Sequence, residues 1–160
     1  MNTIDTSAIL SRSSLGAELD APERDTLAAR MGLIRLTDGE TLVHEGDDRQ
    51  TLFLLAAGRL NVCKSVGGVE ETVYQMRAGE CSGTRAFIDG SRRRAALRAE
   101  GDCAILTLEP ADFDALVETH PRLVFKIMKA FFRITHSNLM RMNLESAEMR
   151  NYLMRSGGRY

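Results

Sequence analysis

The chain has 160 residues, of which 44% are hydrophobic and 27% charged, and its formal net charge is −1. This length and composition suit one globular domain with a real hydrophobic core. The near-neutral charge argues against a nucleic-acid-binding protein, because neutralising phosphates usually requires a basic surface.

Residues 1–31 are predicted to form N-terminal helices, since apolar residues recur at helical spacing on both sides of Asp20. Asp20 can accept hydrogen bonds from the free N–H groups of a first helical turn. Pro22 would lie in the first turn of the helix, where the N–H group that proline lacks would have no partner within the helix. A helix is therefore expected to begin directly after Asp20.

Residues 32–108 change in character and predict a β-roll. Short apolar segments such as TLFLLAAG and RLNVCKS are separated by glycine and aspartate, with turn signals about every 8–12 residues. The sequence Val66-Gly67-Gly68 predicts a hairpin, because both glycines tolerate positive φ. The lack of long helical crossovers excludes a parallel sheet of the Rossmann type.

Residues 109–155 are predicted to form C-terminal helices. The first opens at Glu109-Pro110. Its predicted apolar face consists of Phe113, Leu116 and Val117. Pro121 interrupts this helix, because the residue before a proline is disfavoured in the helical region. A long helix then follows and ends within residues 156–160.

A set of glycine-punctuated segments between residues 27 and 142 resembles the cyclic nucleotide-binding domain family. The matching segments are residues 39–42, 45–47, 52–55, 58–62, 78–80 and 87–90, followed by Arg93 and Ala95. The resemblance implies a mainly β fold with flanking helices. More specifically, it implies a double-stranded β-helix (a jelly-roll-like β-roll) with N-terminal helices and a long C-terminal helix, in a single domain over residues 1–160.

In this family a phosphate-binding cassette follows a pattern close to G-E-x-[small]-x-[apolar]-x-G-x-P-R-[ST]-A-[TS], which residues 83–96 resemble. A glycine and a short helix start offer N–H groups to a cyclic phosphate, and an arginine adds a bidentate contact. A glutamate accepts from the ribose 2′-hydroxyl. The ligand-binding residues that the resemblance implies are Gly83, Thr84, Arg85, Ala86, Arg93, Arg94 and Ala95.

The cassette segment departs from the pattern at several positions. Thr84 replaces the ribose-binding glutamate, and the loss of a charged partner costs roughly 1.5–3 kcal/mol, or about a tenfold to hundredfold weaker affinity. The other departures are Arg85 for an apolar residue, Arg92 for proline, Arg94 for Ser/Thr and Ala96 for the final hydroxyl residue.

The arginines of the cassette allow three interpretations. They suit an anion with more than one phosphate, such as a cyclic dinucleotide. Alternatively, Arg92 and Arg94 face solvent or pair with acidic neighbours, as residues in charge runs usually do. In the third interpretation the pocket is empty and the domain serves only as a dimer scaffold or docking surface.

The long C-terminal helix carries more apolar surface than one face of the roll can cover. Its predicted partner-facing stripe consists of Val124, Ile127, Phe131 and Ile134. This 3-4 spacing favours pairing with a partner helix in a homodimer, and the alternative is packing against the chain's own roll. In the resembled family this helix covers the nucleotide, which implies Thr135 and Asn138 as lid residues.

No catalytic constellation is visible: the sequence has no nucleophile elbow, complete P-loop or suggestive carboxylate pair. Cys63, Cys81 and Cys103 lack metal-ligand spacing, so reduced thiols, no metal and no cofactor are expected. No segment resembles a signal peptide or reaches the length of a membrane span, which favours a cytoplasmic protein without a membrane partner.

The resemblance therefore implies a non-enzymatic regulatory sensor that binds a cyclic nucleotide (cAMP or cGMP) or a related phosphorylated ligand. It is expected to signal through its C-terminal helix to a protein partner whose identity is unknown. The tail after Met142 is too short for the helix-turn-helix module of DNA-binding relatives, so direct DNA binding is not expected. The alternative function is a ligand-independent dimerisation and docking module that has lost nucleotide binding.

Overall fold

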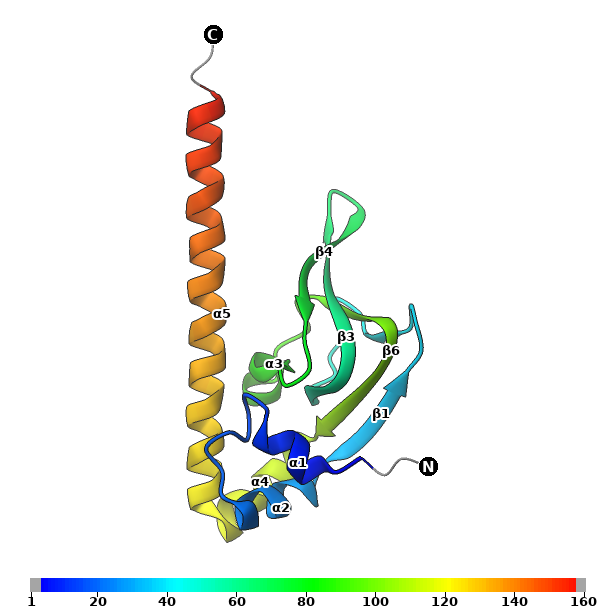
Figure 1. Ribbon diagram of the computed structural model, residues 1–160, viewed down its shortest axis with the longest axis vertical. Helices are drawn as coiled ribbons and strands as arrows, with labels where there is room; N and C mark the ends of the chain where they lie inside the picture. Colours follow the sequence, from blue (N-terminus) through cyan, green and yellow to red (C-terminus); the bar gives the residue numbers. More distant parts are fainter. Residues whose placement is uncertain (1–3, 158–160) are drawn as a thin grey trace.

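A six-stranded antiparallel sheet forms the centre of residues 4–157, the part of the chain that the computed structural model describes. In chain order the elements are α1 (Thr6–Ser11), α2 (Ala21–Ala28), β1 (Gly32–Leu36), β2 (Thr41–Val43), β3 (Leu52–Val66), β4 (Val69–Met76), β5 (Cys81–Ser82), α3 (Thr84–Asp89), β6 (Ala96–Leu108), α4 (Pro110–Thr119) and α5 (Pro121–Ser156). Figure 1 shows α1, α2 and α4 gathered at one end of the sheet, while α5 runs alongside the sheet and beyond it. The predicted fold class, mainly β with flanking helices, is confirmed.

Two long strands, β3 and β6, form the middle of the sheet. The strand order is β1-β6-β3-β4, with β2 added to β6 and β5 added to β3. The pairing of β3 with β6 shifts in register on both sides of Ala57, next to Gly58. Gly58 has a φ of 89°, and a Cβ there would collide with the carbonyl oxygen of Asp102. Such irregularities bend long strands and allow the sheet to curl into a roll.

The side chains of β3 alternate between two hydrophobic cores. Leu52 and Leu54 belong to the core that faces the helices, while Phe53 and Leu55 belong to the core inside the roll. All four are fully buried. Because successive residues of a strand point to opposite faces, one strand that is covered on both sides serves both cores.

The N-terminal helices are capped as predicted and hold the first part of α5. Asp20 accepts a hydrogen bond from the Glu23 N–H at 2.8 Å, and Glu23 accepts one from the Asp20 N–H at 2.9 Å, which makes a capping box. The same Glu23 carboxylate lies 2.7 Å from Lys126 Nζ on α5. Glu18 pairs with Arg133 of α5 at 2.6 Å, and this contact lowers the pKa of Glu18.

The hairpin of β3 and β4 projects from the roll on the same side as the far end of α5 (Figure 1). Its predicted turn is confirmed, because Val66 pairs with Val69 around Gly67 and Gly68. The φ values of the two glycines are 59° and 83°. Two successive positive φ angles are the requirement of a tight hairpin turn.

Helices α4 and α5 are separated at His120 and Pro121, as the proline predicted. Phe113 and Leu116 of α4 are buried in the helix-side core. Val117 is 45% exposed, so its predicted place in the apolar face of α4 is wrong. One residue beyond Leu116 is a rotation of about 100° around a helix, which carries Val117 away from the core.

The predicted partner-facing stripe of α5 instead packs against the chain's own roll, so that prediction is wrong. Ile127 and Phe131 are buried in the helix-side core, and Val124 and Ile134 are partly buried against it. The sequence alternative of packing on the roll is the arrangement observed. The reason is that β3, α2 and α4 present apolar side chains of the same core to this face of α5.

A different stripe of α5, which we call the outer stripe, is exposed. Its apolar members are Phe125, Met128, Phe132, Leu139, Met142, Met149 and Leu153. Together with Thr135 and Ser146 they follow alternating steps of three and four residues, the spacing of a coiled-coil seam. Although α5 has 36 residues, no helix within residues 4–157 is long and apolar enough to cross a membrane.

Candidate functional site

The cassette segment, residues 83–96, connects β5 to β6 and contains the short helix α3. Gly83 precedes α3 with a φ of 89°, and Gly90 follows it with a φ of 69°. At Gly83 a side chain is excluded for a second reason, because a Cβ would collide with Arg93 Nη1. The backbone at Gly83 and the Arg93 guanidinium are therefore in contact.

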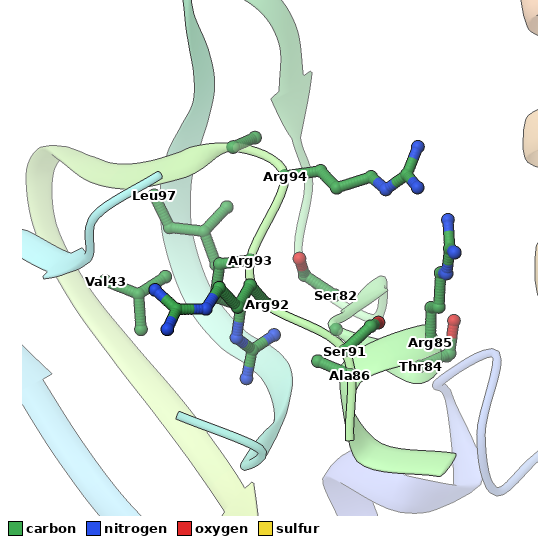
Figure 2. Close-up of a pocket in the computed structure, with 12 residues that line it drawn as sticks. Val43, Ser82, Thr84, Arg85, Ala86, Ser91, Arg92, Arg93, Arg94 and Leu97 are labelled. Carbon is green, nitrogen blue, oxygen red and sulfur yellow. The ribbon is translucent and has the colours of Figure 1, made fainter. Parts of the chain in front are cut away.

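A cavity of about 190 Å³ opens at this segment, and Figure 2 shows its walls. Its lining residues are Val43, Ser82, Gly83, Thr84, Arg85, Ala86, Ser91, Arg92, Arg93, Arg94, Ala95 and Leu97. All seven residues predicted to bind the ligand lie around this one cavity. The predicted lid residues, Thr135 and Asn138, are exposed on α5 and do not line it.

Arg93 is a buried arginine whose guanidinium is held by the protein. It is 6% exposed, its Nε donates to the carbonyl oxygen of Arg49 at 2.7 Å, and its Nη2 donates to the carbonyl oxygen of Thr51. The guanidinium carbon lies 4.9 Å from the centre of the Phe53 ring. Burial lowers the pKa of Arg93, and the neighbouring charge of Arg49 lowers it further. These contacts leave Nη1, against Gly83, as the nitrogen directed at the cassette backbone.

The carbonyl groups that hold Arg93 belong to a polar network that reaches α4. Thr51 is buried, and its hydroxyl donates to the Glu109 carboxylate at 2.8 Å. Arg49 Nε donates to the same hydroxyl oxygen at 3.2 Å. Glu109 is the N-cap residue of α4. The segment at residues 49–51 therefore joins the floor of the cavity to the start of the C-terminal helices.

The other three cassette arginines are exposed and differ in their partners. Arg85 pairs with Asp89 at 3.3 Å on α3, and Arg92 Nη1 lies 3.4 Å from the carbonyl oxygen of Gly46. Arg94 has no hydrogen bond or ion pair with any residue in the range 4–157. Figure 2 shows Arg85 and Arg94 extending to the side of the cavity away from Arg92 and Arg93.

Five lining residues are not among the seven predicted ligand-binding residues: Val43, Ser82, Ser91, Arg92 and Leu97. Val43 and Leu97 come from β2 and β6, where they face each other in the sheet pairing. Ser82 precedes the cassette pattern, and Ser91 occupies an unrestricted position within it. The Ser91 N–H donates to Asp89 at 2.8 Å, and Ser91 is the main cause of a lowered pKa at Asp89. The Ser91 hydroxyl is buried beside this carboxylate, and within residues 4–157 it has no partner at hydrogen-bonding geometry.

Glu80, three residues before Gly83, has a structural role in the turn before β5. Its carboxylate accepts from the Arg77 N–H at 2.7 Å and from the Tyr74 hydroxyl at 2.5 Å. The Tyr74 ring in turn lies 3.7 Å from the guanidinium carbon of Arg141 on α5. We call this set of contacts, Arg141–Tyr74–Glu80, the helix latch.

The charge of the cavity wall is strongly one-sided. Four of its twelve lining residues are arginines, and none is acidic. Asp89 is paired with Arg85, and the charges of Asp47 and Glu109 act on Arg93. Such a wall favours an anion, and the lack of a carboxylate leaves hydroxyl groups such as those of Thr84 and Ser91 as the acceptors for sugar hydroxyls.

Comparison with known proteins gives a consistent picture. A family model described as the cyclic nucleotide-binding domain matches residues 33–120. The cyclic AMP receptor protein of Thermus thermophilus is 28% identical over 130 residues, which is 80% of this chain and 60% of that protein. The cAMP-dependent protein kinase regulatory subunit of Emericella nidulans is 29% identical over 110 residues, 69% of this chain and 26% of the subunit. The chain therefore spans less than two thirds of the length of these relatives.

Solved structures agree with these matches. The regulatory domain of Toxoplasma gondii PKA, solved with cAMP, has a TM-score of 0.62 and 27% identity, covering 69% of this chain and 42% of that one. A cyclic nucleotide-binding domain from Methylobacillus flagellatus has a TM-score of 0.77 and 22% identity, covering 85% and 77%. The second likeness concerns the fold alone.

Proposed function

The chain belongs to the cyclic nucleotide-binding domain family, and on this premise we propose that it is a non-enzymatic regulatory domain that binds a cyclic nucleotide or a related phosphorylated ligand. The proposed ligand residues are Gly83, Thr84, Arg85, Ala86, Arg93, Arg94 and Ala95. We propose that residues 1–160 act as one domain, with N-terminal helices over 1–31, the roll over 32–108 and C-terminal helices over 109–155.

The observation that carries this proposal is the meeting of all seven residues at one cavity with four arginines and no acid. Its volume of about 190 Å³ is below the roughly 300–1,000 Å³ of a complete small-molecule pocket. A phosphate and its ribose would fill such a space. The base would then lie over the rim, on the side where Thr135 and Asn138 of α5 are proposed to act as a lid.

Arg93 is suited to bind the phosphate because it is already fixed in place. Two of its three guanidinium nitrogens are engaged by carbonyl oxygens, so Nη1 beside Gly83 is the one left for an anion. A pre-ordered side chain loses little entropy on binding. Thr84 would contact the 2′-hydroxyl as a neutral partner, and the expected affinity is about tenfold to hundredfold below that of a site with glutamate.

We propose that occupancy is signalled through α5, and the helix latch supports this route. Within residues 135–156, Arg141 is the one residue of α5 that is partly buried, and its side chain contacts Tyr74. Tyr74 is bonded to Glu80, which lies three residues before Gly83. A ligand that shifts the start of the cassette would therefore act directly on the contact that positions the far part of α5.

Calorimetric titration of the whole chain with cAMP and with cGMP tests the binding proposal. We expect binding in the micromolar range, and its loss in Arg93→Ala. Arg59→Ala is the matched control, because Arg59 is an exposed arginine on β3 that does not line the cavity. Thermal unfolding of both variants separates a lost contact from a lost fold. An absence of heat from the folded wild type with every nucleotide tried would contradict the proposal.

The second candidate function, a ligand-independent dimerisation and docking module, is favoured by the outer stripe. Seven large apolar side chains at coiled-coil spacing are exposed on one helix, and Phe132 is 74% exposed. We propose that a second copy of this chain covers the stripe in a homodimer. A dimer that forms equally with and without nucleotide, and a chain that binds no nucleotide, would favour this second function over the first.

A further inference from the structure

We propose that the ligand carries two phosphate groups, and that Arg94 binds the one at the cavity rim while Arg93 binds the one at the floor. This inference rests on the proposed function of the cavity, because it names the class of ligand for the same site. A cyclic dinucleotide and a nucleoside bisphosphate share this chemistry.

Arg93 and Arg94 offer two separate binding positions for anions. The Arg93 guanidinium is buried against Gly83 and Phe53, and carbonyl oxygens of residues 49 and 51 prevent it from following a ligand outward. Arg94 is exposed and extends to the opposite side of the cassette segment (Figure 2). A single cyclic phosphate in contact with Gly83 and Arg93 would leave Arg94 without an anion.

No protein group within the described residues neutralises Arg94. Arg85 has Asp89 as its partner, and Arg92 is turned towards the Gly46 carbonyl oxygen. Arg94 has no hydrogen-bond or ion-pair partner in the described chain. Asp47 and Glu109 act on Arg93, so Arg94 carries a positive charge that a single cyclic phosphate bound at Arg93 would leave unbalanced.

The wall of the cavity also carries hydroxyl groups. Ser91 lines the cavity, and its hydroxyl is a neutral group that adds no charge to repel a phosphate. Together with the Thr84 hydroxyl it replaces the carboxylate that would repel a second phosphate. The cavity wall thus combines two arginines at different depths with neutral hydroxyl groups.

Calorimetric titration with three probes tests the inference: cAMP, cyclic di-AMP and adenosine 3′,5′-bisphosphate, in the same buffer at physiological salt. We expect at least one of the two-phosphate probes to bind about tenfold more tightly than cAMP, since a charge-assisted contact is added. Which of the two binds more tightly identifies the phosphates as diesters or monoesters.

Variants assign this preference to Arg94. In Arg94→Gln the preference for the two-phosphate probe is expected to fall to about twofold or less, because the affinity for that probe falls more than the affinity for cAMP. Arg92→Gln is the matched control and should keep the preference, because Arg92 faces Gly46. The inference is overturned, and the proposed function kept, if cAMP binds as tightly as both other probes or if Arg94→Gln retains the preference. Binding of none of the probes overturns both.

Discussion

The two parts of α5 have the same amphipathic character and opposite surroundings. Residues 121–134 include all the buried residues of the helix, namely Leu123, Ile127, Ala130 and Phe131. Residues 135–156 are exposed except for Arg141, although Leu139, Met142 and Met149 keep the apolar spacing. The apolar periodicity of a helix therefore indicates that one of its faces packs against something, but it does not indicate what that is. The roll meets that need for the first part, whereas the second part is left exposed within the described chain.

The largest effect is expected when a buried side chain in residues 121–134 of α5 is removed, because this part of the helix packs in the core. Phe131→Ala removes a ring that lies 5.7 Å from Phe87 of α3 and 6.2 Å from Phe113 of α4. We expect a loss of about 3–5 kcal/mol in the free energy of unfolding, because a buried aromatic leaves a cavity. Urea unfolding at low protein concentration measures it.

The matched control for Phe131→Ala is its neighbour on the exposed face. Phe132→Ala removes the same side chain at a site that is 74% exposed, and its expected cost to the monomer is within about 0.5 kcal/mol. Equal losses of unfolding free energy in the two variants would show that the two faces of α5 contribute equally to the stability of the monomer.

The next largest effect is expected on dimerisation, when charges are introduced into the outer stripe. Leu139→Glu combined with Met142→Glu places charge in the seam, and we expect the dimer dissociation constant to rise roughly 100-fold or more. The unfolding free energy of the monomer should be unchanged. Ser137→Glu combined with Asn151→Glu adds the same charge off the stripe and should leave the dimer intact. Sedimentation equilibrium decides between these outcomes, and a wild type that is monomeric at high concentration contradicts the homodimer.

A smaller effect is expected at the helix latch, where Arg141 in the far part of α5 contacts Tyr74 of the roll. Arg141→Ala removes the contact with the Tyr74 ring, which is worth about 0.5–1 kcal/mol at a partly exposed site. Hydrogen exchange should become faster in residues 135–156 and stay unchanged in residues 121–134. Unchanged exchange in both parts would show that the latch does not position the helix.

The smallest expected effect is a pH dependence of the same latch. The hydrogen bond to Glu80, followed by burial, raises the pKa of Tyr74 above its ordinary value of 10.0. A raised pKa means that the fold favours the neutral phenol. The latch is therefore expected to be intact below pH 10 and to be lost as the pH rises through the folded pKa. Tyrosine absorbance should show this later ionisation, and Glu80→Gln should bring it back towards the ordinary value.

The sequence predicts the parts of the fold that depend on local chemistry. The Asp20 cap, the Gly67-Gly68 turn and the break at Pro121 were all correct, because each follows from the conformational limits of one or two residues. The seven cassette residues were placed around one cavity, because they are close in sequence and flanked by glycines with positive φ.

The features that the sequence did not predict depend on contacts between distant residues. The partner-facing side of α5 was assigned to the wrong stripe, since a one-residue step turns a helix by about 100° and the side covered by the roll is set by packing. The carbonyl groups that hold Arg93 lie more than 40 residues away, at 49 and 51. Arg141 and Tyr74 are likewise distant in sequence, and neither belongs to a local motif.

We propose above all that occupancy of the cassette cavity is transmitted to the far part of α5. The most direct test is a spin-label distance between Lys64→Cys on the β3–β4 hairpin and Asn151→Cys on α5, in labelled protein diluted with unlabelled chain. The three native thiols are buried, and burial raises the pKa of Cys81 to about 12, so the label is directed to the introduced cysteines. We predict a changed distance distribution when a nucleotide that binds by calorimetry is added. An identical distribution with and without saturating nucleotide would contradict the claim.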